Sequence, residues 1–308
     1  MIQYLQRNQL DDFKYDACIS KAYNSKIYAY SWYLDCVCDD WDVLVKDDYE
    51  AVMPLPKRKK FGIHYVYLPP WTQQLGVFSR NRIENKLINY FINSIPKKFG
   101  FINTHLNAAN PFQSNDSITR SNYELLLHKE YNEIIKGYSK GRKSSISKAK
   151  KYSLQIVEDY NYLEIKKLFQ DNIGNQLTIK KSDYDRLDKL LQITTTKNYI
   201  KSIAILKGDM LVGGAFFLID KPRITYLISA VNKLGRETQA MSLLIDEMIK
   251  KFSNSQYILD FEGSEIEELA FFFKSYGAIN NVYTEIKIYR NNIVKLCISI
   301  IEFIKKHT

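Results

Sequence analysis

Cysteine is scarce in this chain of 308 residues, and the spacing of the cysteines is not that of a metal site. Cys36-x-Cys38 has no second pair to complete a zinc-binding set, and Cys18 and Cys297 stand alone. The four histidines are scattered and form no HExxH motif. We therefore expect reduced thiols in the core, a cytoplasmic protein and no bound metal.

The sequence also lacks an apolar run long enough to cross a bilayer, which takes about 20 residues. The first residues, MIQYLQRNQLDD, are polar, so we expect no secretory signal. Near the end of the chain, apolar residues recur at helical spacing. They are Ile293, Leu296, Ile300, Ile301 and Ile304. This stripe predicts a C-terminal helix that docks on the body of the protein, with peripheral contact at a membrane surface as the alternative.

Acidic residues are outnumbered: 44 Lys and Arg face 34 Asp and Glu, a net charge of +10. This excess favours an anionic partner such as a nucleotide cofactor, RNA or an acidic membrane surface, and a merely basic solvated surface is the alternative. The composition is 45% hydrophobic and 25% charged, without low-complexity tracts, so the chain should fold throughout. Its length suits two domains.

The first half shows both helical and strand-like patterns. We expect helices at 15–22, 30–38 and 83–95, and strands at 41–46, 49–55, 64–68 and 101–106. Pro54 and Pro56 should end the pairing of the second strand. The basic run that follows, 57–60, is then expected to be a solvated loop, with a phosphate contact as its functional alternative.

The second half repeats this architecture. We expect helices at 163–172, 182–192 and 239–252, and strands at 202–207, 210–220, 223–230 and 257–259. The predicted domains are 1–134 and 135–308, the second including a basic linking helix and the C-terminal helix.

The linking helix, 136–151, holds seven Lys and Arg and no acid. Arg142 lies on its apolar stripe, where an unpaired buried charge would be costly. Arg142 therefore needs a carboxylate or phosphate partner, unless its side chain reaches out to solvent.

Two carboxylates, Asp260 and Glu262, follow the strand at 257–259. In open α/β sheets ligands bind beyond the carboxyl ends of the strands, so either carboxylate could act as a general base. Partial burial would raise the pKa of such a carboxylate toward the range that this role requires. The alternative is structural: an ion pair with Arg142, or a cap of the helix that follows.

The order of elements in the second half, helix, hairpin, strand, loop, helix, strand, helix and strand, resembles the GNAT superfamily of N-acyltransferases. The loop LGRETQA, 234–240, resembles that family's phosphate-binding signature but lacks its glycine spacing. The resemblance implies that this loop and the strand before it bind an acyl-CoA pyrophosphate through backbone amides. The implied cofactor-binding residues are Ile228, Ala230, Gly235, Arg236, Gln239 and Ala240.

Three segments resemble Fem-type peptidyltransferases, which are tandem GNAT-fold enzymes: RKSSISKAKKYSLQIVED from Arg142, YLPPWTQQLGVF from Tyr67, and FFKSYGA, 272–278. The resemblance implies that Lys274 acts near the reaction centre. Phe273 stands where many GNAT enzymes have a Tyr acid. The implied substrate-binding residues are Tyr67, Trp71, Gln73, Gln74 and Arg142.

The resemblance implies a mixed α/β (α+β) fold of two tandem GNAT-like domains, each a mostly antiparallel sheet flanked by helices. The expected function is transfer of an acyl group from an acyl thioester such as acyl-CoA to an amine, without a permanently bound cofactor. One alternative is a Fem-like transferase that uses aminoacyl-tRNA and acts on a cell-envelope precursor; its nucleic-acid partner would be tRNA and not DNA. The other alternative is a non-catalytic, degenerate GNAT pair. The expected location is the cytoplasm; alternatively, the cytoplasmic protein contacts the inner face of the membrane peripherally.

Overall fold

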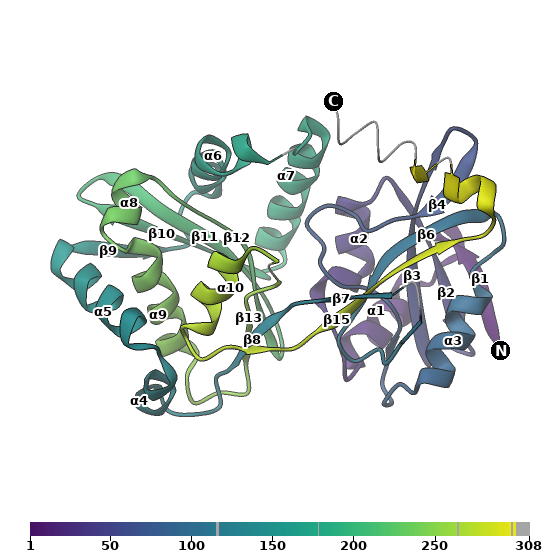
Figure 1. The fold of residues 1–308 in the computed structure, drawn as a ribbon, viewed down its shortest axis with the longest axis horizontal. Helices are drawn as coiled ribbons and strands as arrows, with labels where there is room; N and C mark the ends of the chain where they lie inside the picture. Colours follow the sequence, from purple (N-terminus) through teal and green to yellow (C-terminus); the bar gives the residue numbers. More distant parts are fainter. Residues whose placement is uncertain (115–116, 178, 264, 297, 300–308) are drawn as a thin grey trace. The chain divides into compact units, whose positions relative to one another are not determined.

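The computed structural model describes residues 1–308 except 115–116, 178, 264, 297 and 300–308, and the chain forms two compact units (Figure 1). Unit 1 combines Met1–Arg120 with the segment that begins at Val282, and unit 2 is Ser121–Asn281. The predicted boundary after residue 134 differs from this division. The reason is strand pairing: β8 (Tyr123–Leu126) joins the sheet of unit 2, and β15 (Tyr283–Tyr289) returns to the sheet of unit 1.

The sheet of unit 1 has the strand order β1-β2-β3-β4-β6-β15-β7, with β5 paired to β3. Its parallel pair is β4 and β6, and the other pairs are antiparallel. The remaining strands are β1 (Ile2–Gln6), β2 (Asp40–Lys46), β3 (Ala51–Lys60), β4 (Ile63–Val66), β5 (Phe78–Ser79), β6 (Phe99–Leu106) and β7 (Ser117–Arg120). The helices are α1 (Asp12–Lys21), α2 (Ser31–Val37) and α3 (Asn85–Ser94).

Strand β2 shows how the two faces of this sheet are buried. Because side chains alternate along a strand, Trp41 and Leu44 point to opposite faces. The Trp41 ring lies 5.4 Å from the ring of Tyr15 on α1, whereas Leu44 joins the core that includes Ile88 and Phe91 of α3. Helices therefore cover both faces of the sheet.

The expectation that Pro54 and Pro56 end the second strand is wrong, because β3 continues to Lys60. Strand β3 pairs with β2 along 51–57, but on its other side it pairs with β5 only at 51–52 and with β4 only at 57–60. The two prolines lie in the gap between those neighbours, where a backbone N–H is not needed on that side. The basic run is thus the end of a β-hairpin and not a loop.

The sheet of unit 2 has the order β14-β8-β13-β12-β11-β10-β9, and its parallel pair is β12 with β13. Its strands are β8, β9 (Leu154–Glu158), β10 (Ile200–Lys207), β11 (Met210–Asp220), β12 (Arg223–Val231), β13 (Ile258–Asp260) and β14 (Ile279–Asn280). Its helices are α4 (Tyr131–Ile134), α5 (Lys140–Ala149), α6 (Tyr162–Asn172), α7 (Lys181–Thr196), α8 (Lys233–Glu237), α9 (Ala240–Phe252) and α10 (Glu267–Lys274).

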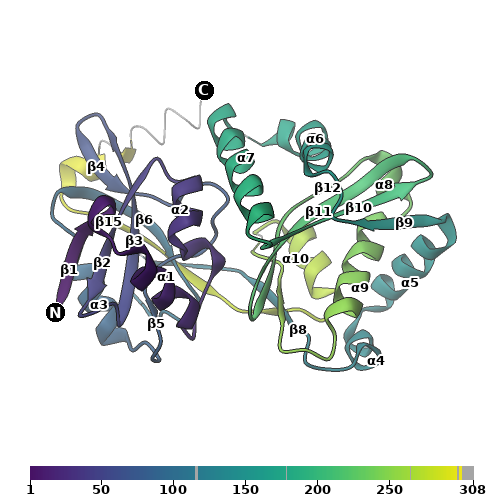
Figure 2. The same cartoon turned by 180° about the vertical axis from the view of Figure 1, so that it is seen from behind.

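Helices α6 and α7 cover one face of this sheet, and α9 with α5 covers the other (Figures 1 and 2). Gly214 of β11 permits the close approach of α6, since a Cβ there would lie 2.9 Å from a side-chain carbon of Ile165. On α9, Leu244, Ile245 and Met248 enter the core, as the helical stripe in the sequence predicts.

The basic linking helix is shorter than predicted. Helix α5 starts at Lys140 because Ser139 caps it, the Ser139 side chain accepting a hydrogen bond from the Arg142 amide at 3.1 Å. Part of the predicted polar loop before α9 is the one-turn helix α8, capped by Asn232.

The C-terminal stripe departs from the prediction. Helical structure begins at residue 292, but Ile293 and Leu296 are 75% and 63% exposed, so docking through these residues is wrong. Val294 is buried instead, because Gly100 of β6 leaves room beside it. The rest of the stripe, from Ile300 on, and Cys297 lie outside the described residues. Within the described part of the chain, no helix has the length and hydropathy needed to span a membrane.

Candidate functional site

Strands β12 and β13 part from each other soon after they pair. Their parallel register covers three residue pairs, from Arg223 opposite Ile258 to Thr225 opposite Asp260, although β12 continues to Val231. Strand β12 also contains a bulge at Leu227, which has no partner on β11 between Tyr226 and Ile228. A bulge increases the local twist, so the strands diverge toward their carboxyl ends, where ligands bind in sheets of this kind.

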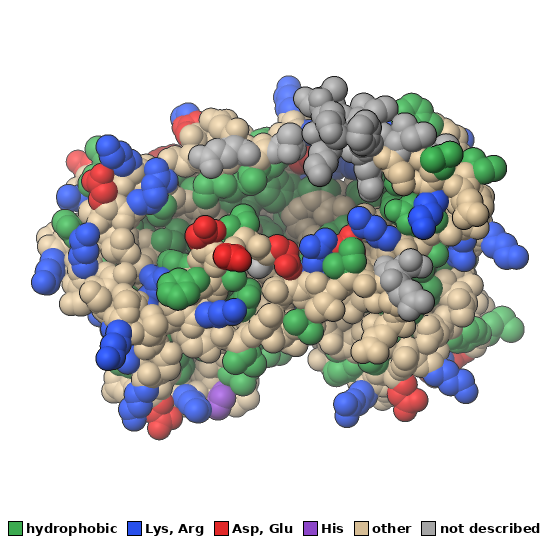
Figure 3. Space-filling view, in the orientation of Figure 1, with side chains coloured by type: hydrophobic (Ala, Val, Ile, Leu, Met, Phe, Trp, Pro, Cys, Tyr) green, Lys and Arg blue, Asp and Glu red, His purple; other side chains and the backbone are tan. Residues whose placement is uncertain are grey.

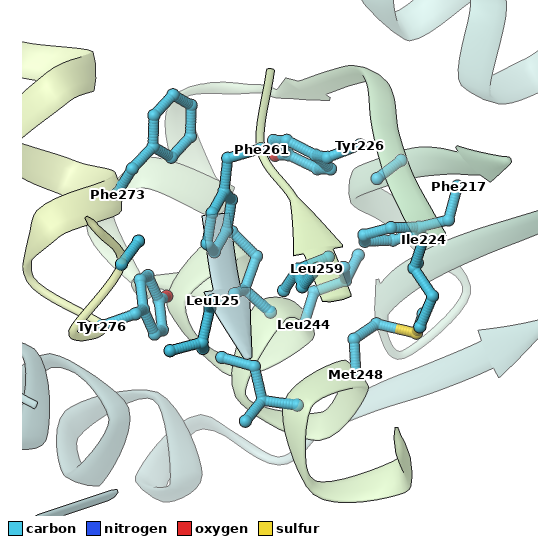
Figure 4. Close-up of a cluster of buried hydrophobic side chains, with 14 of the residues drawn as sticks. Leu125, Phe217, Ile224, Tyr226, Leu244, Met248, Leu259, Phe261, Phe273 and Tyr276 are labelled. Atoms are coloured by element: carbon cyan, nitrogen blue, oxygen red, sulfur yellow. The ribbon is translucent and has the colours of Figure 1, made fainter. Parts of the chain in front are cut away.

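Aromatic side chains pack at this divergence (Figure 4). The rings of Phe261 and Phe273 stack with centroids 4.9 Å apart, and Tyr226 meets Phe261 edge-on at 6.2 Å. The ring of Tyr276 also stacks with that of Phe261, at 6.0 Å, and its hydroxyl donates a hydrogen bond to the Ser242 carbonyl at 3.1 Å. Burial raises the pKa of Tyr226 and of Tyr276 well above the usual range, so both phenols keep their protons.

The two predicted carboxylates have different surroundings. Asp260 is fully buried, and its carboxylate accepts hydrogen bonds from Arg223 at 3.1 Å and from the Glu262 amide at 3.1 Å. Arg223 also contacts the buried Glu124 at 2.5 Å. The structural partner of Asp260 is therefore Arg223 and not Arg142. Glu262 is partly exposed and has a left-handed backbone with φ of 59°.

Arg142 is 7% exposed and comes from α5, yet it does not contact a carboxylate among the described residues. Its guanidinium donates to the hydroxyls of Ser275, at 2.9 Å, and of Ser242 in the first turn of α9. It also lies over the rings of Phe272, at 4.1 Å, and Tyr276, at 4.5 Å. Burial lowers the pKa of Arg142, which remains charged at neutral pH.

The start of α9 adds to the positive potential around Arg142. The first amides of a helix have no acceptor within it, and the dipole of the helix makes this end positive. Helix α9 has 13 residues, and its N-cap Gln239 has a left-handed backbone with φ of 59°. Arg142 and the first turn of α9 thus form a polar cluster with the chemistry to bind an anion.

The other predicted cofactor-binding residues do not all lie at this end of α9. Gln239 and Ala240 begin the helix, whereas Ile228 and Ala230 of β12 pair with Phe216 and Gly214 of β11, on the face of the sheet that α6 covers. Ile228, Ala230 and Ala240 are buried. Gly235 is in α8, where a Cβ would lie 2.1 Å from the Val212 carbonyl oxygen, so α8 packs directly on β11. Arg236 is exposed and donates a hydrogen bond to the Val231 carbonyl at 3.1 Å.

Lys274 is the last residue of α10 and is exposed. Its ammonium lies 5.5 Å from the centre of the Tyr123 ring, and no described carboxylate contacts it. Phe273, the neighbour in sequence, points instead into the aromatic cluster (Figure 4). Both side chains lie beside the ring of Tyr123, but Lys274 is exposed whereas Phe273 is buried.

The predicted acceptor residues belong to unit 1, and two of them hold the fold together. Tyr67 is buried, accepts a hydrogen bond from the Asp39 amide at 3.1 Å, and its ring lies 4.1 Å below Arg58. Gln74 is fully buried and accepts from the Ala108 amide at 3.1 Å. Trp71 and Gln73 are partly exposed and are accessible to a ligand.

A polar cluster next to Gln73 was not expected from the sequence. The His105 Nδ1 lies 2.8 Å from the Gln73 carbonyl oxygen, and its Nε2 lies 3.9 Å from Glu285, the residue opposite it on β15. Burial lowers the pKa of His105, which is therefore neutral at pH 7. Burial alone would raise the pKa of Glu285, but the hydrogen bond and charge of Arg120 outweigh it and lower that pKa.

Comparison with solved structures identifies the fold. No protein-family model matches the sequence, and no curated protein matches it. The crystal structure of FemX superposes with a TM-score of 0.66 and 11% identity, covering 92% of this chain and 96% of FemX. L-PGS from Bacillus licheniformis gives a TM-score of 0.54 at 11% identity, over 96% and 97% of the two chains. A tandem GNAT protein from the clavulanic acid biosynthesis pathway gives 0.52 at 10%, over 94% and 99%.

The fold is a tandem GNAT fold. This confirms the prediction of two mixed, mostly antiparallel sheets flanked by helices, and the resemblance to the Fem type. Within the tandem GNAT fold, Arg142, Asp260 and the loop before α9 all belong to unit 2, whereas Trp71, Gln73 and His105 belong to unit 1.

The surroundings of Arg142 include Ser242, which the sequence did not single out. They also include Phe272, Ser275 and Tyr276, which belong to the FFKSYGA segment but had no expected role of their own. The sequence offered two signals: Ser242 in the first turn of a predicted helix, and the aromatic residues within FFKSYGA. Neither pattern indicates a partner that is 100 or more residues away.

Proposed function

We propose that the chain is an N-acyltransferase that binds the phosphate groups of an acyl-CoA donor at Arg142 and the first turn of α9. The observation that carries this proposal is the buried guanidinium of Arg142, which contacts serine hydroxyls and aromatic rings but no described carboxylate. Its positive charge is expensive to bury without an anion. The helix N-terminus beside it supplies further donors for phosphate oxygens.

In the proposed reaction the acceptor amine attacks the carbonyl carbon of the thioester, and the C–S bond then breaks. Glu262 takes the proton from the amine, since it is partly exposed, whereas the buried Asp260 is held by Arg223 and positions the backbone of Glu262. Lys274 stabilises the negative charge that develops on oxygen and on the departing thiolate. On unit 1, considered by itself, Trp71 and Gln73 are the partly exposed members of the predicted acceptor set, and we propose that they contact the acceptor.

A second donor, an aminoacyl-tRNA, is favoured by one feature of α5. Lys140, Lys143 and Lys148 are exposed and contact no described carboxylate, so they can bind RNA phosphates. The acceptor would then be a cell-envelope precursor. A cytoplasmic protein with peripheral contact to the inner face of the membrane through its C-terminal helix fits either donor.

Thermal unfolding with acetyl-CoA, long-chain acyl-CoA and charged tRNA tests the proposal. A ligand at 100 times its dissociation constant adds about 2.7 kcal/mol to the free energy of unfolding. Stabilisation by an acyl-CoA supports the first donor, and stabilisation by charged tRNA alone supports the second. No response to any of them would refute both and favour a non-catalytic GNAT pair.

A further inference from the structure

One end of unit 1 carries exposed apolar side chains on two separate segments. Phe61, in the turn between β3 and β4, is 76% exposed. Ile293 and Leu296, after β15, are 75% and 63% exposed. Scattered exposed apolar residues are normal in soluble proteins, but a cluster of large ones indicates a binding surface.

The β3–β4 turn and the segment after β15 lie on either side of Gly100. Gly100 of β6 lies between them, since a Cβ there would be 3.2 Å from a side-chain carbon of Ile63 and 3.4 Å from one of Val294. Ile63 is the first residue of β4, directly after the turn that holds Phe61, and Val294 lies between the two exposed apolar residues of the C-terminal segment. The exposed side chains therefore belong to one surface.

Cations gather around this surface. Lys57, Arg58, Lys59, Lys60 and Lys98 line a groove of about 590 Å³ beside the hairpin. Asp40 and Asp42 pair with Lys57, and Asp39 pairs with Arg58. Lys59, Lys60 and Lys98 are exposed and have no carboxylate partner among the described residues. Over β4, in the upper right of Figure 3, blue and green side chains lie together.

The turn itself is unfavourable for Phe61. Its φ is 51° and that of Gly62 is 79°, so both central residues have the left-handed backbone of a type I′ turn. Glycine and asparagine adopt this backbone easily, whereas a bulky aromatic residue does so at a cost. Neither folding nor packing requires a phenyl ring here, because the ring is exposed.

We propose that this end of unit 1 binds the surface of an anionic phospholipid bilayer. Phe61, Ile293 and Leu296 enter the headgroup layer, while Lys59, Lys60 and Lys98 contact lipid phosphates. Aliphatic side chains distinguish this surface from one for single-stranded RNA, where bases stack on aromatic rings. The inference extends the proposed membrane contact of the C-terminal helix to a second element, the β3–β4 hairpin, and does not depend on acyl transfer.

Vesicle co-sedimentation of the full chain tests the proposal, with pure phosphatidylcholine compared with equal parts of phosphatidylcholine and phosphatidylglycerol. Wild type should bind the anionic vesicles, more weakly at high salt. Lys59→Gln with Lys60→Gln should lower the partition coefficient roughly 25-fold, because each lysine near an anionic surface contributes about a factor of five. Phe61→Asn should weaken binding while suiting the turn, so its folding is retained.

A matched control changes two other exposed lysines of unit 1, Lys21→Gln with Lys86→Gln, at equal loss of net charge. The proposal is overturned if the control loses as much binding as the hairpin variant, or if wild type binds both vesicles equally. It is also overturned if the hairpin variant loses affinity for single-stranded RNA while its vesicle binding is unchanged. No acyl donor is present, so these outcomes are independent of the thermal tests with acyl-CoA and tRNA.

Discussion

Replacing Arg142 by methionine separates binding of the donor from stability of the fold. Methionine is similar in length to the arginine stem, and its flexible thioether can keep the contacts with the rings of Phe272 and Tyr276. The positive charge and the donors to Ser242 and Ser275 are lost. Arg142→Met therefore removes the proposed anion contact without opening a large cavity.

The expected change in stability is small because two effects oppose each other. Hydrogen bonds to a charged group contribute about 1.5–3 kcal/mol each, and two such bonds are lost. Removing the guanidinium also relieves a desolvation penalty of several kcal/mol, which no described carboxylate offsets. We expect the free energy of unfolding to change by less than about 1.5 kcal/mol, as for other swaps of similar volume.

The expected change in donor binding is larger. Loss of charge-assisted hydrogen bonds to phosphate should weaken binding by about 2.7 kcal/mol, roughly a 100-fold rise in Kd. At an acyl-CoA concentration of 100 times the wild-type Kd, stabilisation would fall from about 2.7 to about 0.4 kcal/mol. Thermal unfolding with and without acyl-CoA measures both quantities in one experiment.

Lys143→Met is the matched control, because Lys143 is the next residue on α5 and is exposed. It should keep nearly the full stabilisation by acyl-CoA. A loss of more than about 3 kcal/mol of stability in Arg142→Met, with ligand stabilisation intact, would show that Arg142 is a structural residue.

Glu262→Gln should abolish acyl transfer with little change in Tm, as measured by product formation and calorimetry, because its carboxylate is the proposed base. Asp260→Asn should lower stability by about 1–3 kcal/mol, because it removes the charge of one of the two buried carboxylates that contact Arg223, while Glu124 remains. His105→Asn should flatten the pH dependence of stability: the pKa of His105 is depressed in the fold, so its contribution is present above about pH 6.5 and is lost as pH falls through the folded pKa. Gly235→Ala should cost about 3 kcal/mol in urea unfolding, because its Cβ would collide with a backbone carbonyl oxygen 2.1 Å away.

Each of these outcomes has a clear opposite. Full turnover in Glu262→Gln would show that Glu262 is not the base. Unchanged stability in Asp260→Asn would show that the ion pair between Asp260 and Arg223 does not stabilise the fold. An unaltered slope of stability between pH 5 and about 6.5 in the histidine variant would contradict its burial as a neutral group. Gly141→Ala is the control for Gly235→Ala: its nearest neighbour would be 3.9 Å away, so it should stabilise by about 0.5–1 kcal/mol.

Hairpins and amphipathic helices of the tandem GNAT fold could be predicted because their signals are local. The turn at Gly208 joins β10 and β11 as expected, and the stripe of α9 faces the core. Strand β15 could not be assigned, since its partners on β6 precede it by about 180 residues and no local pattern identifies them. The sequence does not predict the hairpin end at 57–60, because the effect of proline on a strand depends on which side of the strand is paired, and that pairing is not visible in the sequence.

The sequence by itself determined that Arg142 lies on the buried face of a basic helix and that two carboxylates follow a strand. It also determined the order of elements by which the fold was recognised. The tertiary structure decided the partners: serines and aromatic rings for Arg142, and Arg223 for Asp260. The physical reason is that side-chain periodicity depends on neighbours in the chain, whereas the compensation of a buried charge depends on groups that folding brings together from positions far apart in the chain.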